Sequence, residues 1–297
     1  MAKPKILIQL DADAHASVFD AVVAVDAGID HLFQYHSVTP EKIRDLVYGA
    51  MFTRGGPDLA STALFIGGSN VAAGEQLLRK AVGCFFGPMR VSVMLDANGA
   101  NTTAAAAVIA AGRHLPVAPG GKPPTTALVL GATGPVGQRV ARLLASRGAS
   151  VHVASRSLPR AEEAAAQVRA VVPDARCEPV EWSGGVQAAA AVARLVERAD
   201  LVVAAGRAGV TMLDGPGRAL ATSAKVFIDL NAVPPAGIDG ILPTDKARRD
   251  GSAVVYGALA VGGLKMRIHR AAIARIFERA DVFLAAEELL ALGESLV

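Results

Sequence analysis

The segment that most constrains this chain is a short apolar run that leads into a glycine turn and an amphipathic helix. Leucine and valine fill residues 128–130, and glycines follow at positions 131, 134 and 137. Apolar residues then recur at helical spacing, at Val136, Val140, Leu143 and Leu144. This order predicts a strand, a tight turn and a helix, because glycine permits positive φ and close backbone approach.

A turn of this kind can bind a phosphate group. The helix that follows offers unpaired N–H groups and the positive end of its dipole. The Gly-x-x-Gly-x-x-Gly spacing differs from the usual dinucleotide fingerprint, so an ordinary glycine-rich turn is the alternative. As a dinucleotide site, the turn would use Gly131, Thr133, Gly134, Pro135, Val136 and Gly137.

Length and composition favour two α/β domains. The chain has 297 residues, which suits two domains on the usual size range, and aromatic residues make up only 4%. Alanine, valine and leucine supply most of the apolar content. Alanine favours helices and valine favours strands. The longest apolar run, residues 104–111, is far shorter than the roughly 18 residues that a membrane span needs. We expect a cytoplasmic protein that does not bind membranes.

Charge and cysteine content exclude several classes of protein. The chain carries 30 basic and 27 acidic residues, without basic runs interleaved with aromatics, so nucleic-acid binding is not expected. Its two cysteines, Cys84 and Cys177, show no metal-ligand spacing and suit buried thiols. We expect no metal site.

The first third of the chain alternates between strand and helix patterns. Ser17 and Thr39 are candidate helix caps, and Pro40 suits a first helical position. Such βα alternation predicts a parallel sheet with helices on its faces. The expected strands are 5–10, 31–35, 62–66 and 91–95, and the expected helices are 17–27, 39–51, 70–82 and 102–112.

Polar residues follow three of these strands. Asp11 and Asp13 follow the first strand, residues 67–70 follow the third, and residues 96–103 follow the fourth. Parallel strands end at one edge of a sheet, where ligands bind, so these clusters are expected to converge on a cleft. The alternative is that each residue only caps a helix or shapes a turn.

Proline and glycine dominate residues 114–125, which we interpret as a linker. The predicted domains are 1–115 together with 260–297, and 125–258, because the last helices are expected to return to the first domain. Expected strands of the second domain are 128–130, 150–154, 176–180, 200–204 and 225–229, with helices at 160–171 and 186–198.

The residues that end the second of these strands indicate which dinucleotide binds. An NAD site usually places a carboxylate about 20 positions after the glycines, whereas this chain has Ser155 and Arg156. A hydroxyl and a guanidinium would bind a 2′-phosphate, so NADP is favoured and NAD stays possible. The alternative is that Arg156 and Arg160 are only solvated residues at a helix start.

Three further positions are candidates for the site. Ala205 and Asn231 follow the fourth and fifth strands, where small residues and an amide suit a flat nicotinamide ring, although plain turns explain them nearly as well. Lys265 follows a glycine-rich stretch, residues 257–263, and lies in an expected helix that runs to about residue 279. We expect Lys265 to lie near the interdomain cleft. The alternative is that Lys265 lies on the solvent-exposed face of a helix.

Several motifs together resemble a known family. The sequence is similar, nearly from end to end, to the NADP-dependent methylenetetrahydromethanopterin/methylenetetrahydrofolate dehydrogenases of methylotrophic bacteria. The matching segments are residues 17–20, 38–40, 52–56, 65–68, 86–88, 94–103, 131–137, 231–238 and 257–265.

The resemblance implies a pterin-substrate domain, a Rossmann-type NADP domain and a homo-oligomer. It implies reversible oxidation of a methylene-pterin to the methenyl form. Lys265 then corresponds to the active-site lysine, and Arg156 to a residue that binds the 2′-phosphate, although Ser157 replaces the second basic residue often found there. Asp20, Asn98, Thr102 and the adjacent Thr103 correspond to the pterin cleft.

Two other functions fit the same residues. A different two-domain NADP oxidoreductase, of the shikimate or glutamate-semialdehyde type, would give Lys265 no special role. A non-catalytic NADP-binding protein would bind cofactor without hydride transfer.

In the favoured reaction, positioning of the substrate matters more than acid–base chemistry, since the pterin nitrogens stabilise the cation that hydride loss leaves.

Overall fold

The computed structural model describes residues 3–117, 124–182 and 190–297. The chain forms two compact units, Met1–Thr102 with Met266–Val297, and Thr103–Lys265. The unit boundaries fall within helices α4 (Ala100–Gly112) and α9 (Ala258–Arg275). The middle of the predicted linker and the first residues of the predicted helix 186–198 lie outside the described residues.

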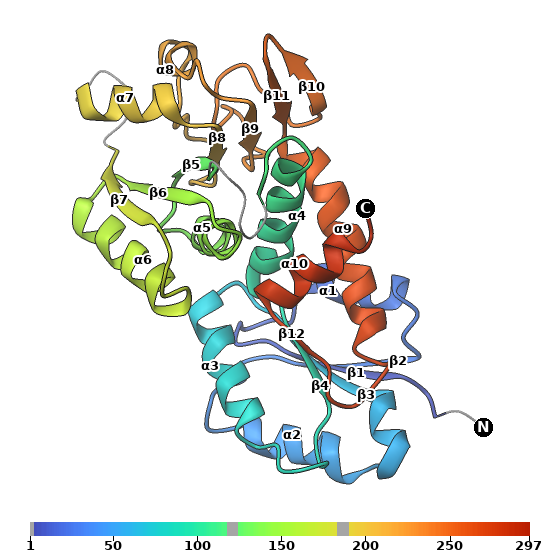
Figure 1. Cartoon of the computed structure of the whole chain (residues 1–297). Coiled ribbons are helices and arrows are strands. Elements are labelled where there is room, and N and C mark those ends of the chain that lie inside the picture. The colour runs from blue at the N-terminus through green and yellow to red at the C-terminus, as the bar shows by residue number, and fades with distance from the viewer. Residues whose placement is uncertain (1–2, 118–123, 183–189) are drawn as a thin grey trace. The chain divides into compact units, whose positions relative to one another are not determined.

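The first unit is built on a parallel five-stranded sheet with the strand order β12-β4-β3-β1-β2 (Figure 1). Its strands are β1 (Ile6–Leu10), β2 (His31–Tyr35), β3 (Thr62–Ile66), β4 (Ser92–Leu95) and β12 (Phe283–Leu284), and its helices are α1 (Val18–Asp26), α2 (Ile43–Phe52), α3 (Val71–Val82) and α10 (Ala286–Glu294).

Local sequence signals fix most of these elements. The Ser17 hydroxyl accepts a hydrogen bond from the Asp20 N–H, so the predicted cap at Ser17 is confirmed. The Asn70 side chain caps α3 in the same way, by accepting a hydrogen bond from the Ala73 N–H. Apolar side chains of α2 and α3, such as Val47 and Leu77, pack with Leu64 and the other strand residues of one sheet face. That burial is what stabilises the unit.

One predicted helix start is wrong. The motif at Thr39 and Pro40 does not begin α2, whose N-cap is Lys42. The N–H groups of Lys42 and Ile43 both donate to the Thr39 carbonyl, so residues 40–42 form a turn that precedes the helix. The capping signal therefore marked the turn before the helix rather than the helix itself.

The second unit contains a seven-stranded sheet with the order β10-β11-β9-β8-β5-β6-β7, parallel except for the β10–β11 pair. Helices α5 and α6 cover one face and α7 the other (Figure 1). Its strands are β5 (Thr126–Leu130), β6 (Ser150–Ser155), β7 (Cys177–Glu181), β8 (Leu201–Ala204), β9 (Val226–Asp229), β10 (Lys246–Asp250) and β11 (Ala253–Tyr256), with helices α5 (Pro135–Ser146), α6 (Leu158–Val171), α7 (Ala190–Arg198) and α8 (Gly215–Leu220).

The C-terminal part of this unit differs from expectation. Strands β10 and β11 were not predicted, because β10 is a charged edge strand and β11 is only a four-residue apolar run. Helix α9 begins at Ala258 and includes Gly262 and Gly263, so the glycine-rich stretch is helical rather than a loop before the helix. Helix α9 thus forms despite the low helix propensity of glycine.

Both sheets are doubly wound, which confirms the predicted fold class. In the first sheet the chain passes from β1 to β2 on one side and then to β3 on the other. In the second sheet β5 lies between β6 and β8, where the strand order reverses in the same way. Ligands of such sheets bind outside the carboxyl ends of the strands at these switch points. Among the described residues, no helix is long and apolar enough to cross a membrane.

Leu128 tests the core of the second unit. It is fully buried on the central strand β5, so Leu128→Ala should lower the free energy of unfolding by about 2–5 kcal/mol through the cavity it leaves. Val171, whose side chain is 54% exposed, provides the matched control, and Val171→Ala should change stability little. Chemical denaturation followed by circular dichroism measures both. An equal loss for the two variants would contradict the assigned core.

Candidate functional site

The glycine turn joins β5 to α5 and is tightly packed against the loop after β8. Gly131 has φ +73°, and a Cβ there would lie 2.5 Å from the Gly206 Cα. At Gly137 a Cβ would lie 2.6 Å from the Gly131 carbonyl oxygen. Both contacts involve backbone, which cannot move aside, so these two positions require glycine.

The first turn of α5 is open to an anion. Gly134 is the N-cap and makes no side-chain capping bond, and Pro135 occupies the first turn. The N–H groups of Val136 and Gly137 therefore have no partner within the helix and lie at its positive end. Thr133, half-buried, directly precedes the cap. This arrangement suits a pyrophosphate held by backbone N–H groups.

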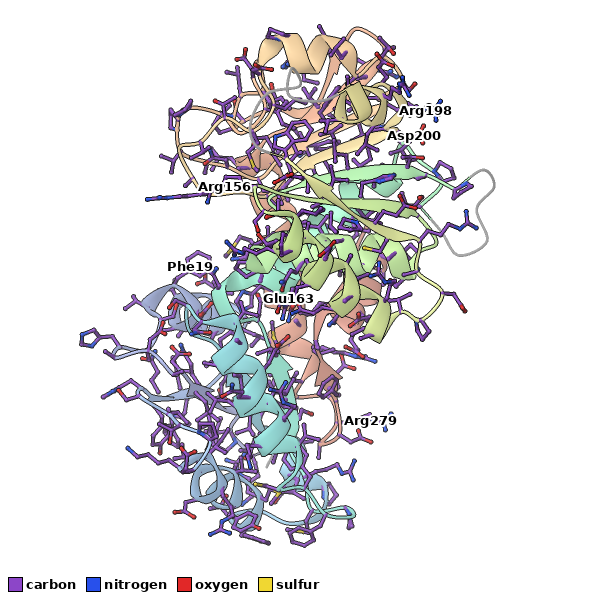
Figure 2. All side chains as sticks on the ribbon, turned by 90° about the vertical axis from the view of Figure 1, so that its left-hand side faces the viewer. Phe19, Arg156, Glu163, Arg198, Asp200 and Arg279 are labelled. Atoms are coloured by element: carbon purple, nitrogen blue, oxygen red, sulfur yellow. The ribbon has the colours of Figure 1, made fainter. Side chains whose placement is uncertain are left out.

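The end of β6 lies beside this turn. The N–H groups of Gly131 and Ala132 donate to the Ala154 carbonyl, one residue before Ser155. The Ser155 side chain is buried, whereas Arg156 is exposed and extends away from the ribbon (Figure 2). Arg160 is also exposed, on the first turn of α6. The segment after β6 thus carries two exposed guanidinium groups and a buried hydroxyl, which accepts a hydrogen bond from the Ser157 N–H.

The ends of β8 and β9 complete this edge of the sheet. Ala205 is half-buried, and its N–H donates to the Leu130 carbonyl. The Asn231 side chain donates to the Pro235 carbonyl and accepts from the Val233 N–H, each within 3.0 Å. The amide of Asn231 therefore fixes the loop at residues 231–235.

Asp229, at the end of β9, is a structural residue that the sequence analysis did not single out. Its carboxylate accepts hydrogen bonds from the N–H groups of Asn231, Gly237 and Ile238. Burial raises the pKa of Asp229, and these hydrogen bonds oppose that rise. A Cβ at Gly237 would lie 2.6 Å from the Asp229 carboxylate, so the pairing of a strand-end Asp with a later Gly is the signal that could have identified it.

In the first unit, the polar clusters after β1, β3 and β4 meet as expected. The Asp13 carboxylate accepts from the Ser69 N–H at 2.7 Å and from the Ser69 hydroxyl at 3.1 Å. The Asn98 N–H donates to the Gly68 carbonyl at 2.6 Å. Hydrogen bonds thus join all three strand-end segments at the β1/β3 switch point.

Two carboxyl groups flank Gly67 at this point. A Cβ on Gly67 would lie 2.5 Å from Asp11 Oδ1 and 3.3 Å from Asp20 Oδ2. Asp11 is fully buried, and its Oδ2 accepts from Gln9 and from the Ser17 N–H. Burial raises the pKa of Asp11, outweighing these hydrogen bonds, and nearby Asp13 adds to the rise. Asp20 is the more accessible carboxyl of the two.

The remaining candidates differ in accessibility. Asn98 is exposed and has a left-handed backbone conformation, with φ 56°. Thr102 is fully buried, and its hydroxyl donates to Asp96 at 2.5 Å. Thr103 and Lys265 are half-buried, and they are the first and last residues of the second unit. Asp20 and Asn98 both lie next to the segment Gly67–Gly68.

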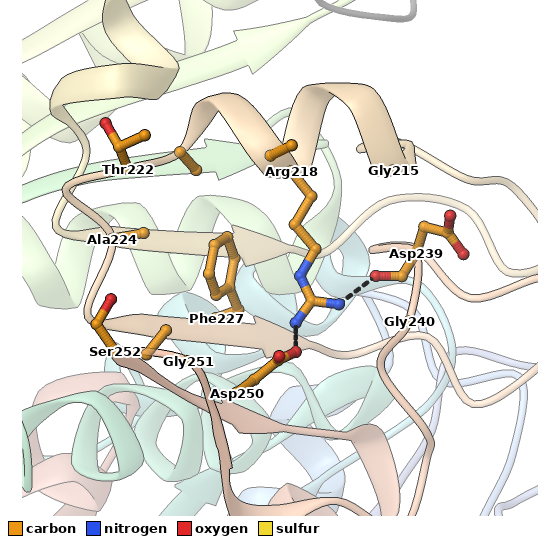
Figure 3. A pocket seen from close by; sticks show the side chains of 13 residues that line it. Gly215, Arg218, Thr222, Ala224, Phe227, Asp239, Gly240, Asp250, Gly251 and Ser252 are labelled. Atoms are coloured by element: carbon orange, nitrogen blue, oxygen red, sulfur yellow. Dashed lines mark hydrogen bonds and ion pairs between the residues drawn. The ribbon is translucent and has the colours of Figure 1, made fainter.

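A surface hollow of about 460 Å³ lies elsewhere in the second unit, between α8 and the β10–β11 hairpin (Figure 3). The Arg218 guanidinium donates to the Asp239 carbonyl and to the Asp250 carboxylate, and it lies 5.2 Å from the centre of the Phe227 ring. Arg218 therefore joins α8 to the hairpin. None of the predicted site residues lines this hollow.

Solved structures share this two-domain α/β fold. Quinate dehydrogenase from Corynebacterium glutamicum, in complex with NAD, has a TM-score of 0.53 at 15% identity and covers 99% of this chain and 100% of its own. Ornithine carbamoyltransferase from Pyrococcus furiosus has a TM-score of 0.52 at 12% identity and covers 95% and 85%. These similarities define the fold class, doubly wound α/β with two domains.

Sequence relatives define the family. Residues 18–98 match the model for methylene-tetrahydromethanopterin dehydrogenase, N-terminal. The bifunctional protein MdtA of Methylorubrum extorquens is 41% identical over 98% of this chain and 99% of its own length. The NAD(P)-dependent methylenetetrahydromethanopterin dehydrogenase of that organism is 31% identical over 88% and 87%. The chain belongs to the methylene-tetrahydromethanopterin dehydrogenase family.

Asp11 predicts a pH-dependent difference in stability. Because its pKa is raised in the folded protein, the folded state holds more protons than the unfolded state, so this group lowers stability as pH rises above about 4. Asp11→Asn removes the charge and leaves an acceptor for Gln9 and Ser17. The stability of the variant relative to the parent should increase between about pH 4 and pH 7. Urea unfolding at each pH measures it, and parallel curves would contradict the assignment.

Proposed function

We propose that this protein catalyses the reversible NADP-dependent dehydrogenation of a methylene-tetrahydropterin to the methenyl form. The observation that carries the proposal is the match, over nearly the whole chain, to a relative named as an NAD(P)-dependent methylenetetrahydromethanopterin dehydrogenase. The preference for NADP and the choice between tetrahydromethanopterin and tetrahydrofolate are part of the proposal. We also propose that the protein is a homo-oligomer in the cytoplasm.

The second unit has the features that a dinucleotide needs. The Val136 and Gly137 N–H groups would bind the pyrophosphate, and Gly131 and Gly137 leave no side chain in its way. Ser155 and Arg156 would bind the 2′-phosphate, supported by Arg160, and Ala205 and the Asn231 loop would flank the nicotinamide. When bound, NADP supplies the hydride acceptor.

The first unit would bind the pterin. Asp20 and Asn98 are accessible at the β1/β3 switch point and can bond the ring's amide and amino groups. Thr102 acts from the interior, because its hydroxyl holds Asp96 beneath the Asn98 loop. Lys265 would steer and polarise the pterin with its ammonium group. Since the substrate's own nitrogens stabilise the cation, these residues contribute mainly alignment and exclusion of water.

Turnover tests the function directly. Purified protein should reduce NADP, seen as NADPH absorbance, with methylene-tetrahydromethanopterin or methylene-tetrahydrofolate. Lys265→Met should lower kcat by about 100-fold through loss of the positioned charge, and NADPH affinity should not change. Lys246→Met, at an exposed position on β10, is the control. Protein that binds NADPH but turns over neither pterin would support the non-catalytic alternative.

Arg156 tests the cofactor preference. Arg156→Asp places a negative charge beside the proposed 2′-phosphate, so kcat/KM for NADP should fall by about 100-fold while that for NAD changes little. The exposed Arg198, at the end of α7 and far from Arg156 in Figure 2, gives the control Arg198→Asp. An unchanged NADP/NAD ratio in Arg156→Asp would remove this residue from the proposed site.

A further inference from the structure

One buried carboxylate organises the loop after β4 and the start of α4. Asp96 is fully buried, and its Oδ1 accepts from the Asn101 and Thr102 N–H groups, each at 3.0 Å. Its Oδ2 accepts from the Thr102 hydroxyl. The exposed Asn98 lies between these points of attachment, two residues after Asp96.

The same carboxylate meets a buried histidine from α9. His269 Nδ1 lies 3.9 Å from Asp96 Oδ2, and both side chains are 0% exposed. The imidazole also stacks on the Phe65 ring of β3, with a centroid distance of 5.5 Å and an interplanar angle of 30°. His269 is therefore held between a sheet residue and the Asp96 loop.

His269 and Lys265 are four residues apart on one continuous helix. That spacing places them on the same face, one turn apart. The hydrogen-bonded helix between them has little freedom, so a constraint on His269 also restricts the turn that carries Lys265.

We propose that Asp96 and His269 form a positioning pair, which fixes the Lys265 turn of α9 and the Asn98 loop through a single carboxylate. The inference about Lys265 rests on the function proposed above. The pair links two segments that lie far apart in the sequence and that both carry proposed substrate residues.

Burial of these polar groups argues against a purely packing role. Taking an ionisable pair fully out of water is costly, and an apolar side chain of similar size would pack against Phe65 as well as the imidazole does. What an apolar replacement lacks is the capacity of the imidazole to form an ion pair with Asp96, whose Oδ2 lies 3.9 Å from Nδ1. An ion pair with Asp96 would fix the position of α9 more narrowly than packing alone.

His269→Phe and Asp96→Asn remove the contact from each side. Phenylalanine keeps the stacking on Phe65, and asparagine keeps an oxygen for the N–H groups of Asn101 and Thr102. The control is His152→Phe on β6, because His152 lies at a similar distance, 4.0 Å, from Glu178.

Each variant should lower kcat for the pterin by about 10- to 100-fold at temperatures well below its melting point, through misplacement of Lys265. The double variant should lose no more than either single variant, because the two residues act through one contact. NADPH affinity, which we assign to the glycine turn in the proposed function, should be unchanged. His152→Phe should keep its kcat.

A second readout does not depend on turnover. Mass spectrometry can follow the rate at which acetic anhydride modifies Lys265, with Lys246 as internal reference. Relative to the parent protein, this rate should change in the same direction in His269→Phe and in Asp96→Asn. Unchanged Lys265 rates, or losses of kcat that add in the double variant, would overturn the positioning pair. If the parent has no turnover but the Lys265 rates still shift in both variants, the pair stands and the proposed function fails.

Discussion

The close approach of backbone segments at the β5/β8 switch point is the constraint on which the second unit depends. Gly131 leaves no room for a Cβ against Gly206, and Gly137 leaves none against the Gly131 carbonyl. This crowding brings the start of α5, with the N–H groups that have no partner within the helix, to the end of the sheet. The proposed dinucleotide site follows from a lack of side chains, which is why its strongest signal is three glycines.

The first unit uses the same topology with a different chemistry. Its β1/β3 switch point is lined by carboxyl, hydroxyl and amide groups rather than by bare backbone, and hydrogen bonds join the three strand-end segments. A polar heterocycle suits such a surface, whereas a phosphate would be repelled by Asp11, Asp13 and Asp20. The chemistry of the two switch points thus differs in the way that the proposed function requires, with one site for a pterin and one for a dinucleotide.

Several polar residues at the strand ends hold neighbouring segments in place. Thr102 and Asn231 are predicted ligand contacts, and in the structure their side chains are hydrogen-bonded to Asp96 and to the loop at residues 231–235. Asp229 likewise holds three backbone N–H groups. Buried polar groups need such partners, so a polar residue at a strand end often becomes part of the loop's own scaffold.

The sequence alone determined the doubly wound fold, most strands, the cap at Ser17 and the glycine turn, because these depend on local spacing and backbone freedom. It missed β10, β11 and the true start of α2, where sheet-edge pairing and turn bonds outweigh local pattern. Only the tertiary structure decided that Asp96 meets His269 and that Asp11 lies opposite Asp20 across Gly67. These contacts depend on residues from distant parts of the chain, His269 for Asp96 and Gly67 for the two aspartates, so no local periodicity predicts them.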